Sequence, residues 1–338
     1  MRKPDFNQLL KVLDKQQPDR PTLFEFFLNT PLYKEYAGFT PENGTLEENY
    51  RFMAAAFGGA GYDYATVPGS RFTFPAGEVH TDKTRSLNEG TVIRDRASFE
   101  AYTWQEPDQH DYSTLDTVPL PEGMKWIVSG PGGVLENAIG LVGYDQLCVL
   151  MYEDPTLTQA IFDAVGSRLV RHYERSACKP AVGACISNDD WGFKTQTMLS
   201  PVDMRKYVFP WHVRIVDAIH KEGKPAILHS CGFATDIMSD IVNMMHFDGK
   251  HSFEDVIQPI EDAYEQYHGQ VALLGGIDVD FICRNTPERV YERTKAMLQR
   301  AQGRGSYAVG TGNSVPEYVP TAGYKAMIAA ALDGTFAS

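Results

Sequence analysis

The sequence is poor in several residue types, and each shortage argues against a class of protein. Its 338 residues include only five cysteines, an odd number scattered along the chain, so we expect free thiols in a reducing cytoplasm rather than a disulfide scaffold. Basic residues are also scarce, since 31 Lys and Arg against 44 Asp and Glu leave a net charge of −13. This balance argues against nucleic-acid partners and anionic membranes. No apolar run approaches the roughly 18–20 residues of a membrane span, and the N-terminal residues are too polar for a signal peptide. A cytoplasmic enzyme is therefore the class we expect.

What the sequence does contain is a series of short apolar runs bounded by Gly, Pro or charged residues, as is typical of strands buried on both faces. Eight such runs occur, at residues 22–26, 64–67, 125–129, 182–187, 226–229, 247–250, 271–275 and 307–309. Segments with helical spacing precede several of them, at residues 156–176, 203–220 and 286–302, and Pro210 is expected to kink the second. Eight strands with intervening helices predict a (β/α)₈ TIM barrel.

Residues 70–124 do not fit a bare strand–helix repeat. The segment is rich in Thr, Pro, Gly, Asp and aromatic residues and is too long for a simple loop. We expect it to form an insertion or a cap over one end of the barrel. No internal repeat, low-complexity tract or Gly/Ser linker divides the chain, so residues 1–338 are expected to form a single domain.

In such a barrel the chemistry lies at the C-terminal ends of the strands. Polar and ionisable residues are concentrated at these ends, namely Glu25, Asn29, Asn188, Asp190, His229, Cys231, His251, Glu254 and Asn313. The adjacent carboxylates of Asp189 and Asp190 can act as an acid and a base if one of them is desolvated. Alternatively, one of the two carboxylates caps a turn or the next segment.

His229-Ser230-Cys231 is the most reactive of these sequences. Residues i and i+2 of an extended strand point to the same side, so an imidazole and a thiolate can meet one metal ion there. Imidazole with sulfur suits zinc. The tripeptide alone is more often a buried cysteine beside a hydrogen-bonded histidine, but its place at the end of a central strand, with His251 and Glu254 expected nearby, favours a metal site.

Four sequence motifs, taken in order, resemble those of the uroporphyrinogen decarboxylase superfamily. They are PDRP at residues 18–21, GP…G…EDP within residues 130–155, DDWG…LSP within residues 189–201 and ILHSCG at residues 227–232. The resemblance covers most of the chain and implies a (β/α)₈ barrel, in agreement with the strand count.

Within that superfamily, the chain is more similar to the cobalamin-dependent methyltransferases than to the decarboxylases. The decarboxylase branch needs arginines after the first strand to hold tetrapyrrole carboxylates, and no arginine occurs between Arg20 and Arg51. The methyltransferase branch implies zinc on an H-x-C motif and on a second cysteine after the eighth strand. His229 and Cys231 match the first part, but the second cysteine is missing, with Thr311 about where it would stand.

Two interpretations of this departure stay open. In one, zinc binds through His229 and Cys231 together with His251, Glu254 or an aspartate. In the other, the metal is lost and these residues bind substrate through hydrogen bonds.

The leading hypothesis from the resemblance is a methyltransferase of a corrinoid-dependent demethylation system. Its substrate would be a small methylated compound, for example an aryl methyl ether, and the corrinoid would be carried by a partner protein that docks over the barrel mouth. Zinc on His229 and Cys231 would act as a Lewis acid, while Asp190 or Glu254 would handle the proton or complete the metal shell. The candidate substrate-binding residues are Glu25, Asn29, Asn188, His251 and Asn313.

Two alternatives stay open: a decarboxylase or lyase of a small acid on the same barrel, and a non-catalytic protein that binds a corrinoid or tetrapyrrole. The pattern is also compatible with a homodimer.

Overall fold

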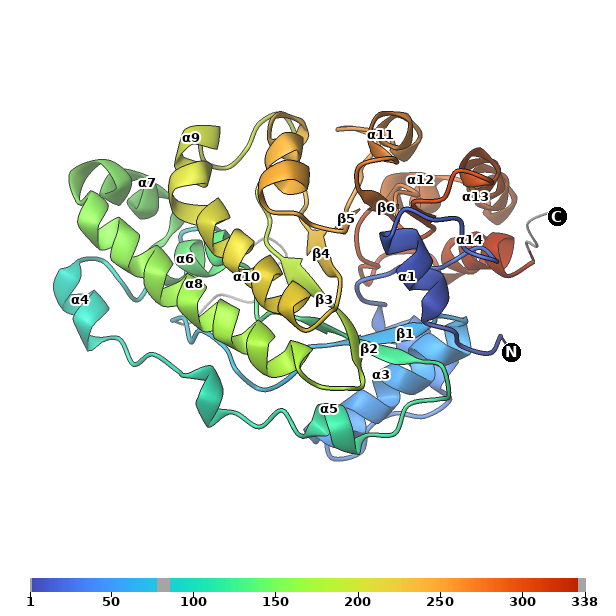
Figure 1. The fold of residues 1–338 in the computed structure, drawn as a ribbon, viewed down its shortest axis with the longest axis horizontal. Helices are drawn as coiled ribbons and strands as arrows, with labels where there is room; N and C mark the ends of the chain where they lie inside the picture. The colour runs from blue at the N-terminus through green and yellow to red at the C-terminus, as the bar shows by residue number, and fades with distance from the viewer. Residues whose placement is uncertain (1, 78–85, 334–338) are drawn as a thin grey trace.

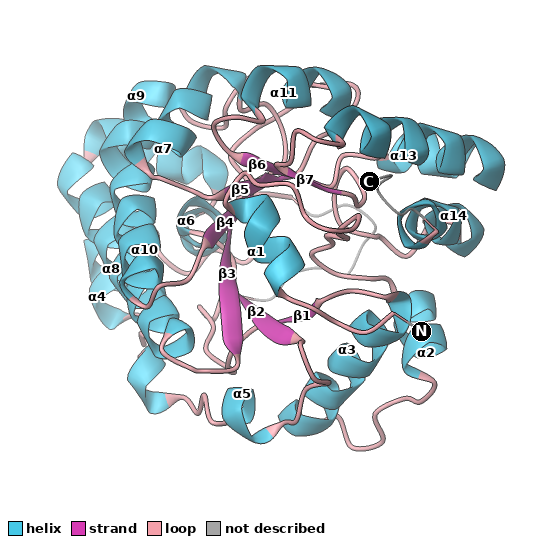
Figure 2. Cartoon of the chain, turned by 45° about the vertical axis from the view of Figure 1, so that its right-hand side comes forward, coloured by secondary structure: helices cyan, strands magenta, loops and turns pink. Residues whose placement is uncertain are grey.

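The computed structural model describes residues 2–77 and 86–333 of the chain. In this part of the chain, seven parallel strands form one curved sheet, and their order in the sheet is their order in the sequence. The strands are β1 (Tyr64–Val67), β2 (Lys125–Ser129), β3 (Val182–Asn188), β4 (Ala226–His229), β5 (Gly249–His251), β6 (Ala272–Leu274) and β7 (Tyr307–Ala308). Parallel neighbours in chain order require crossover connections, which here carry the helices around the outside of the sheet (Figure 2).

The helices fill these connections (Figure 1). They are α1 (Asn7–Leu13), α2 (Thr30–Ala37), α3 (Leu46–Ala60), α4 (Arg96–Ala101), α5 (Thr114–Thr117), α6 (Val134–Val142), α7 (Tyr144–Glu153), α8 (Pro155–Ala177), α9 (Pro201–Asp203), α10 (Phe209–Lys221), α11 (Ile260–Tyr267), α12 (Val279–Arg284), α13 (Pro287–Ala301) and α14 (Thr321–Leu332). Short 3₁₀ or π segments are η1 (Pro107–Gln109), η2 (Met204–Val208), η3 (Thr235–Ile237) and η4 (Asp240–Met244). The helices predicted at residues 156–176 and 286–302 are confirmed as α8 and α13.

The helix predicted at residues 203–220 is interrupted near its start. The π turn η2 comes first, and the regular helix α10 begins only at Phe209. Pro210 occupies the first turn of α10, where the missing N–H of proline costs no helical hydrogen bond. The irregularity near Pro210 is the π turn on its N-terminal side, and Pro210 itself lies in the first turn of a regular helix.

The strand predicted at residues 22–26 is reduced to a single bridge. Leu23 pairs in parallel with Val309, through bonds from the Phe24 N–H to the Val309 carbonyl and from the Val309 N–H to the Thr22 carbonyl, both 2.8 Å. On the side of β1, the hydroxyl of Tyr64 bonds the backbone of Glu25, and a side chain thus replaces a ladder of backbone bonds. The segment still lies between β7 and β1, so it occupies the eighth position of the barrel.

The insertion predicted at residues 70–124 is not a simple cap over the barrel. Residues 96–117 carry α4, η1 and α5 and run along the outer face of α8 (Figure 1). Ion pairs hold them there: Arg168 with Glu106, and Arg171 with Asp108 at 2.8 Å. Ser86, Leu87 and Glu89, in contrast, line a cavity at the barrel mouth. Residues 78–85 of the predicted insertion lie outside the described part of the chain.

Helix α1 closes the end of the barrel where the strands begin. A side chain at Gly249, at the start of β5, would lie 2.7 Å from the Leu13 side chain, and one at Gly183 would lie 2.4 Å from the ring of Phe6. A larger residue at either position would have to displace the Leu13 or Phe6 side chain, so the two glycines let the N-terminal segment pack closely against the strands. Helix α1 therefore covers the end of the barrel opposite the carboxyl ends of the strands.

No single helix of residues 2–77 and 86–333 is long and apolar enough to cross a membrane. Helices α6 and α7 pass that test only as a pair, and they meet at a bend of 94°.

Candidate metal and substrate site

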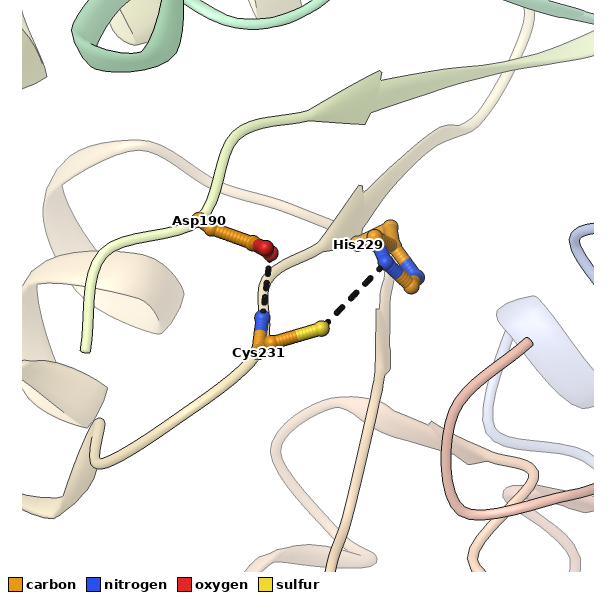
Figure 3. Close-up of side chains that lie close together, drawn as sticks. All are labelled: Asp190, His229 and Cys231. Atoms are coloured by element: carbon orange, nitrogen blue, oxygen red, sulfur yellow. Dashed lines mark hydrogen bonds between the residues drawn. The ribbon is translucent and has the colours of Figure 1, made fainter. Parts of the chain in front are cut away.

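The carboxyl ends of β3, β4 and β5 lie in register, and this register assembles the candidate site. Asn188 pairs with His229, and His229 in turn pairs with His251. Asp190 and Cys231 each lie two residues beyond a member of this row, at the same end of the sheet. One donor atom each from Asp190, His229 and Cys231 lies within 4.8 Å of the others (Figure 3).

Two glycines allow the loops after β3 and β4 to come this close. A Cβ atom on Gly232 would lie 2.0 Å from the carbonyl oxygen of Gly192, and Gly232 has a φ of 82°, which favours glycine. The backbone N–H of Cys231 then donates to Oδ1 of Asp190 at 2.8 Å, and Sγ of Cys231 lies 3.6 Å from Nε2 of His229. The Cys231 backbone thus holds the Asp190 carboxylate in place, and the Cys231 side chain lies next to His229.

A chain of hydrogen bonds sets the tautomer of His229. Its Nδ1 lies 2.8 Å from Nδ1 of His251, and Nε2 of His251 lies 3.4 Å from the carbonyl oxygen of Thr311. Because a carbonyl can only accept, we assign the proton of His251 to Nε2 and that of His229 to Nδ1. The lone pair on Nε2 of His229 therefore faces Cys231 and Asp190, as a metal ligand requires.

Burial keeps both imidazoles neutral. It lowers the pKa of His229 to about 4 and that of His251 well below its ordinary value. Neutral rings are the form that the hydrogen-bond chain needs, since each ring must present one acceptor nitrogen. His251, predicted as a substrate-binding residue, is fully buried behind His229. Its hydrogen bond with His229 favours a role in orienting the His229 ring.

Two more of the predicted substrate-binding residues are turned toward the protein. The Asn29 side chain caps α2 by accepting from the Leu32 N–H at 3.1 Å, and it donates to the carbonyl of Pro316 at 3.2 Å. Glu25 is fully buried, and its carboxyl bonds the backbone and hydroxyl of Thr311 at 3.1 and 2.9 Å. These contacts favour a structural role for Asn29 and Glu25.

Asn188, Glu254 and Asn313 lie at the strand ends as predicted and are partly buried. Asn188 accepts from the Gly130 N–H at 3.1 Å, and Asn313 donates from Nδ2 to the sulfur of Cys231 at 3.1 Å. Burial, together with the nearby Asp278, raises the pKa of Glu254. Glu254 is not part of the three-residue donor group formed by Asp190, His229 and Cys231.

The two adjacent aspartates have different environments. Asp189 is fully buried and accepts from the N–H groups of Leu135 and Glu136, both at 2.9 Å, at the start of α6. It also pairs with Nε2 of His212 at 2.9 Å. Asp189 therefore anchors the start of α6, an earlier helix and not the next segment or turn that the sequence suggested, while Asp190 faces the site.

A cavity of about 300 Å³ adjoins Asp190, which forms part of its wall. Other wall residues are the apolar Leu87, Ile139, Phe193 and Met198 and the acids Glu89 and Glu136. Among the described wall residues none is basic. The described part of the wall is therefore acidic and apolar, and the cavity volume is at the low end of the range for small-molecule sites, roughly 300–1,000 Å³.

Glu136 is the cavity residue that the sequence reasoning missed. Burial, with Asp189 and Asp190 as like-charged neighbours, raises its pKa to about 8, so the carboxyl carries a proton at neutral pH. The only signal in the sequence was its place three residues after Gly133, where its side chain accepts the Gly133 N–H at the start of α6.

The donor set fits zinc. A carboxylate oxygen, an imidazole nitrogen and a cysteine sulfur are all zinc ligands, and three protein ligands with one open position are typical of catalytic zinc sites. Because Asp190 also belongs to the cavity wall, a metal held by these residues would lie beside the cavity. Thr311, which stands where a second cysteine was expected, turns its hydroxyl to the buried Glu25.

Comparison with known proteins gives three kinds of similarity. A family model described as uroporphyrinogen decarboxylase (URO-D) matches residues 126–333, which include Asp190, His229 and Cys231. The uroporphyrinogen decarboxylase of Anaeromyxobacter dehalogenans strain 2CP-C is 25% identical over 248 residues, 71% of this chain and 68% of the relative. That of Anaeromyxobacter sp. strain Fw109-5 is 25% identical over 63% of this chain and 58% of the relative.

A methyltransferase is also among the relatives. The methylated-thiol–coenzyme M methyltransferase of Methanosarcina mazei is 26% identical over 191 residues, and the match covers 56% of this chain but only 48% of the relative. A solved structure of a methyltransferase from Methanosarcina mazei superposes with a TM-score of 0.69 at 15% identity, covering 96% of this chain and 97% of that one. The superposition shows a shared fold.

Proposed function

The chain belongs to the uroporphyrinogen decarboxylase family, and from this premise we propose that it is a methyltransferase. It would move a methyl group between a small methylated compound and a corrinoid carried by a partner protein. The observation that supports this proposal is the group of Asp190, His229 and Cys231 beside a cavity of about 300 Å³. A similar methyltransferase among the relatives makes this chemistry a reasonable one for the barrel.

The charge of the cavity favours methyl transfer over decarboxylation. A substrate with several carboxylates needs arginine or lysine partners. The described cavity wall contains Glu89, Glu136 and Asp190 but no arginine, lysine or histidine. An acidic, partly apolar wall is better matched to a neutral or cationic substrate. An aryl methyl ether fits this description, with its ring against Phe193 and Met198.

The residues then have distinct roles. Asp190, His229 and Cys231 would hold zinc, which when bound supplies a Lewis acid for the heteroatom of the substrate. His251 keeps Nε2 of His229 directed at that position. As the bond between the methyl carbon and the heteroatom breaks, its electron pair stays on the heteroatom, and the protonated Glu136 supplies a proton to it.

Glu254 stays a candidate for the same proton step. Its pKa is raised by burial, but it does not line the cavity. Asn188, at the end of β3, stays a candidate substrate contact.

The test is a methyl-transfer assay with reduced cobalamin and three classes of donor: methyl ethers, methylamines and methoxylated carboxylic acids. We expect methylcobalamin with a neutral or cationic donor, weak transfer from the acids, and loss of transfer in His229→Ala. The matched control is His246→Asn, because His246 is exposed and its positive φ of 58° is tolerated by asparagine. Release of CO₂ from a small acid without methylcobalamin formation would favour the decarboxylase alternative and overturn the proposal.

A further inference from the structure

The loop after β7 approaches Cys231 through Asn313. Nδ2 of Asn313 donates to Sγ of Cys231 at 3.1 Å, a short distance for a hydrogen bond to sulfur. Thr311, two residues earlier in the loop, makes no such approach because its hydroxyl and N–H are bonded to Glu25. The loop therefore presents the amide of Asn313 to the sulfur, two residues after Thr311, which stands about where a second cysteine was expected.

The orientation of the Asn313 amide is fixed by its partners. Its Oδ1 accepts the Ser314 N–H at 2.7 Å, so the oxygen must face the backbone. The NH₂ group then faces the sulfur of Cys231 and the carboxylate of Glu254, and both of these groups are acceptors. A flipped amide would place its oxygen against the sulfur and the carboxylate, and would lose all three bonds.

The loop itself is held close to the barrel. A Cβ atom on Gly312 would lie 2.3 Å from the carbonyl oxygen of Phe253, and the Ser252 hydroxyl donates to the Gly312 carbonyl at 2.6 Å. One residue earlier in the loop, the Thr311 N–H donates to the carboxyl of the fully buried Glu25. On the C-terminal side of Asn313, the Val315 N–H donates to the Phe27 carbonyl at 3.2 Å. The backbone is therefore held before and after Asn313, and its amide stays at hydrogen-bond distance from Cys231.

We propose that Asn313 is a positioning residue of the metal site, which withdraws electron density from the Cys231 sulfur through its N–H···S hydrogen bond in place of a second cysteine ligand. The inference rests on the proposed function in one respect, that Asp190, His229 and Cys231 bind a metal. A sulfur with less electron density to donate leaves the metal a stronger Lewis acid. With one sulfur ligand instead of two, one coordination position also stays open for the substrate.

The test uses cobalt(II) and zinc(II) alone, without substrate or corrinoid. Cobalt bound to a thiolate gives a sulfur-to-metal charge-transfer band, whose energy falls when the sulfur becomes more electron-rich. In Asn313→Ala we expect this band to move to longer wavelength, because the sulfur becomes more electron-rich. We also expect zinc affinity to fall about 10-fold, the low end of the range for residues that support a metal ligand, because the sulfur loses the hydrogen bond that holds it in position. Asn313→Ser, which keeps a donor group, should give an intermediate band. Asn243→Ala, at an exposed asparagine bonded to Ser239, should leave the band where it is in the wild type.

The outcomes separate the two proposals. If the wild type binds neither metal, both the metal site and the role of Asn313 are overturned. If the wild type shows the charge-transfer band and Asn313→Ala shows the same band with the same zinc affinity, only the role of Asn313 is overturned. Thermal unfolding of each metal-free variant checks that a changed band does not come from a misfolded chain.

Discussion

The two ends of the barrel use charged residues in opposite ways. At the end where the strands begin, Asp63 pairs with Arg20 at 2.6 Å and accepts the Asp5 N–H at 2.8 Å, and Asp248 pairs with His220 at 2.8 Å. At the mouth, Glu136 has the acids Asp189 and Asp190 as its charged neighbours. Opposite charges are paired where the strands begin, the end that we call the base of the barrel, whereas Glu136 at the mouth lies beside two acids of the same charge.

This difference indicates that the charges at the start of the strands contribute to stability and those at the mouth to function. Paired charges at the start of the strands tie the N-terminal segment to the barrel and need no ligand. Like charges at the mouth destabilise one another unless a proton, a metal or a substrate enters. We therefore expect changes at the mouth to remove metal binding and activity with little loss of stability, and changes at the base to do the reverse.

The largest expected effect is that of Cys231→Ala. Loss of the only sulfur in the three-residue donor group should lower zinc affinity by more than about 100-fold, beyond the range for residues that support a ligand. The free energy of unfolding of the metal-free protein should change by less than about 1 kcal/mol. Zinc titration and urea unfolding measure the two quantities, with Cys178→Ala, at an exposed thiol, as the control. A variant that keeps its zinc would place the metal elsewhere.

Glu136→Gln tests the proton at the mouth. The pKa of the Glu136 carboxyl is raised to about 8, so the proton-donating form is lost as pH rises through that value. In the wild type, kcat/KM should fall on the alkaline side as Glu136 loses its proton. In the variant this limb should disappear and the rate should be lower by about 100-fold. An unchanged pH profile would mean that Glu136 supplies no proton.

The same residue has a predictable effect on stability. Because its folded pKa is raised above the unfolded value, the folded chain holds a proton that the unfolded chain has already lost between about pH 4.5 and pH 8. The wild type should therefore lose stability relative to Glu136→Gln as pH rises through this window.

Asp63→Ala tests the contribution to stability of the paired charges where the strands begin. Asp63 is almost fully buried, and its removal takes the carboxylate partner from Arg20 and the acceptor from the Asp5 N–H. We expect a loss of about 3 kcal/mol in the free energy of unfolding, with zinc affinity unchanged. Loss of zinc without loss of stability would contradict the division between the two ends.

The smallest expected effect is at His220. Its hydrogen bond with Asp248 raises its pKa, so the pair contributes stability that is fully present below about pH 6.5 and is lost as pH rises through the folded pKa. The melting temperatures of wild type and His220→Gln should differ most at acidic pH and converge at alkaline pH. A constant difference would show that the ring contributes by packing alone.

The features that depend on the order of the strands could be predicted from the sequence. Short apolar runs gave the positions of the strands, and the spacing within His229-Ser230-Cys231 placed two donor groups on one side of a strand. Asp190 was predicted at the same end of the sheet, because it belongs to a pair of acids that follows a strand.

What could not be predicted depends on contacts between loops. Nothing near Glu25 or Asn29 in the sequence reveals that Thr311 or Pro316 will occupy their side chains, so both were taken for substrate contacts. Glu136 looked like an ordinary residue of the first helical turn, and only burial beside two aspartates changes its pKa. Likewise, the segment at residues 22–26 has the composition of a strand, but Tyr64 takes one of its edges.

X-ray absorption spectroscopy of the zinc-loaded protein tests the central claim most directly. We predict one sulfur ligand at about 2.3 Å from zinc, with the remaining ligands nitrogen or oxygen, and loss of the sulfur shell in Cys231→Ala. Two sulfur ligands, or a protein that retains no zinc, would contradict a site built from Asp190, His229 and Cys231.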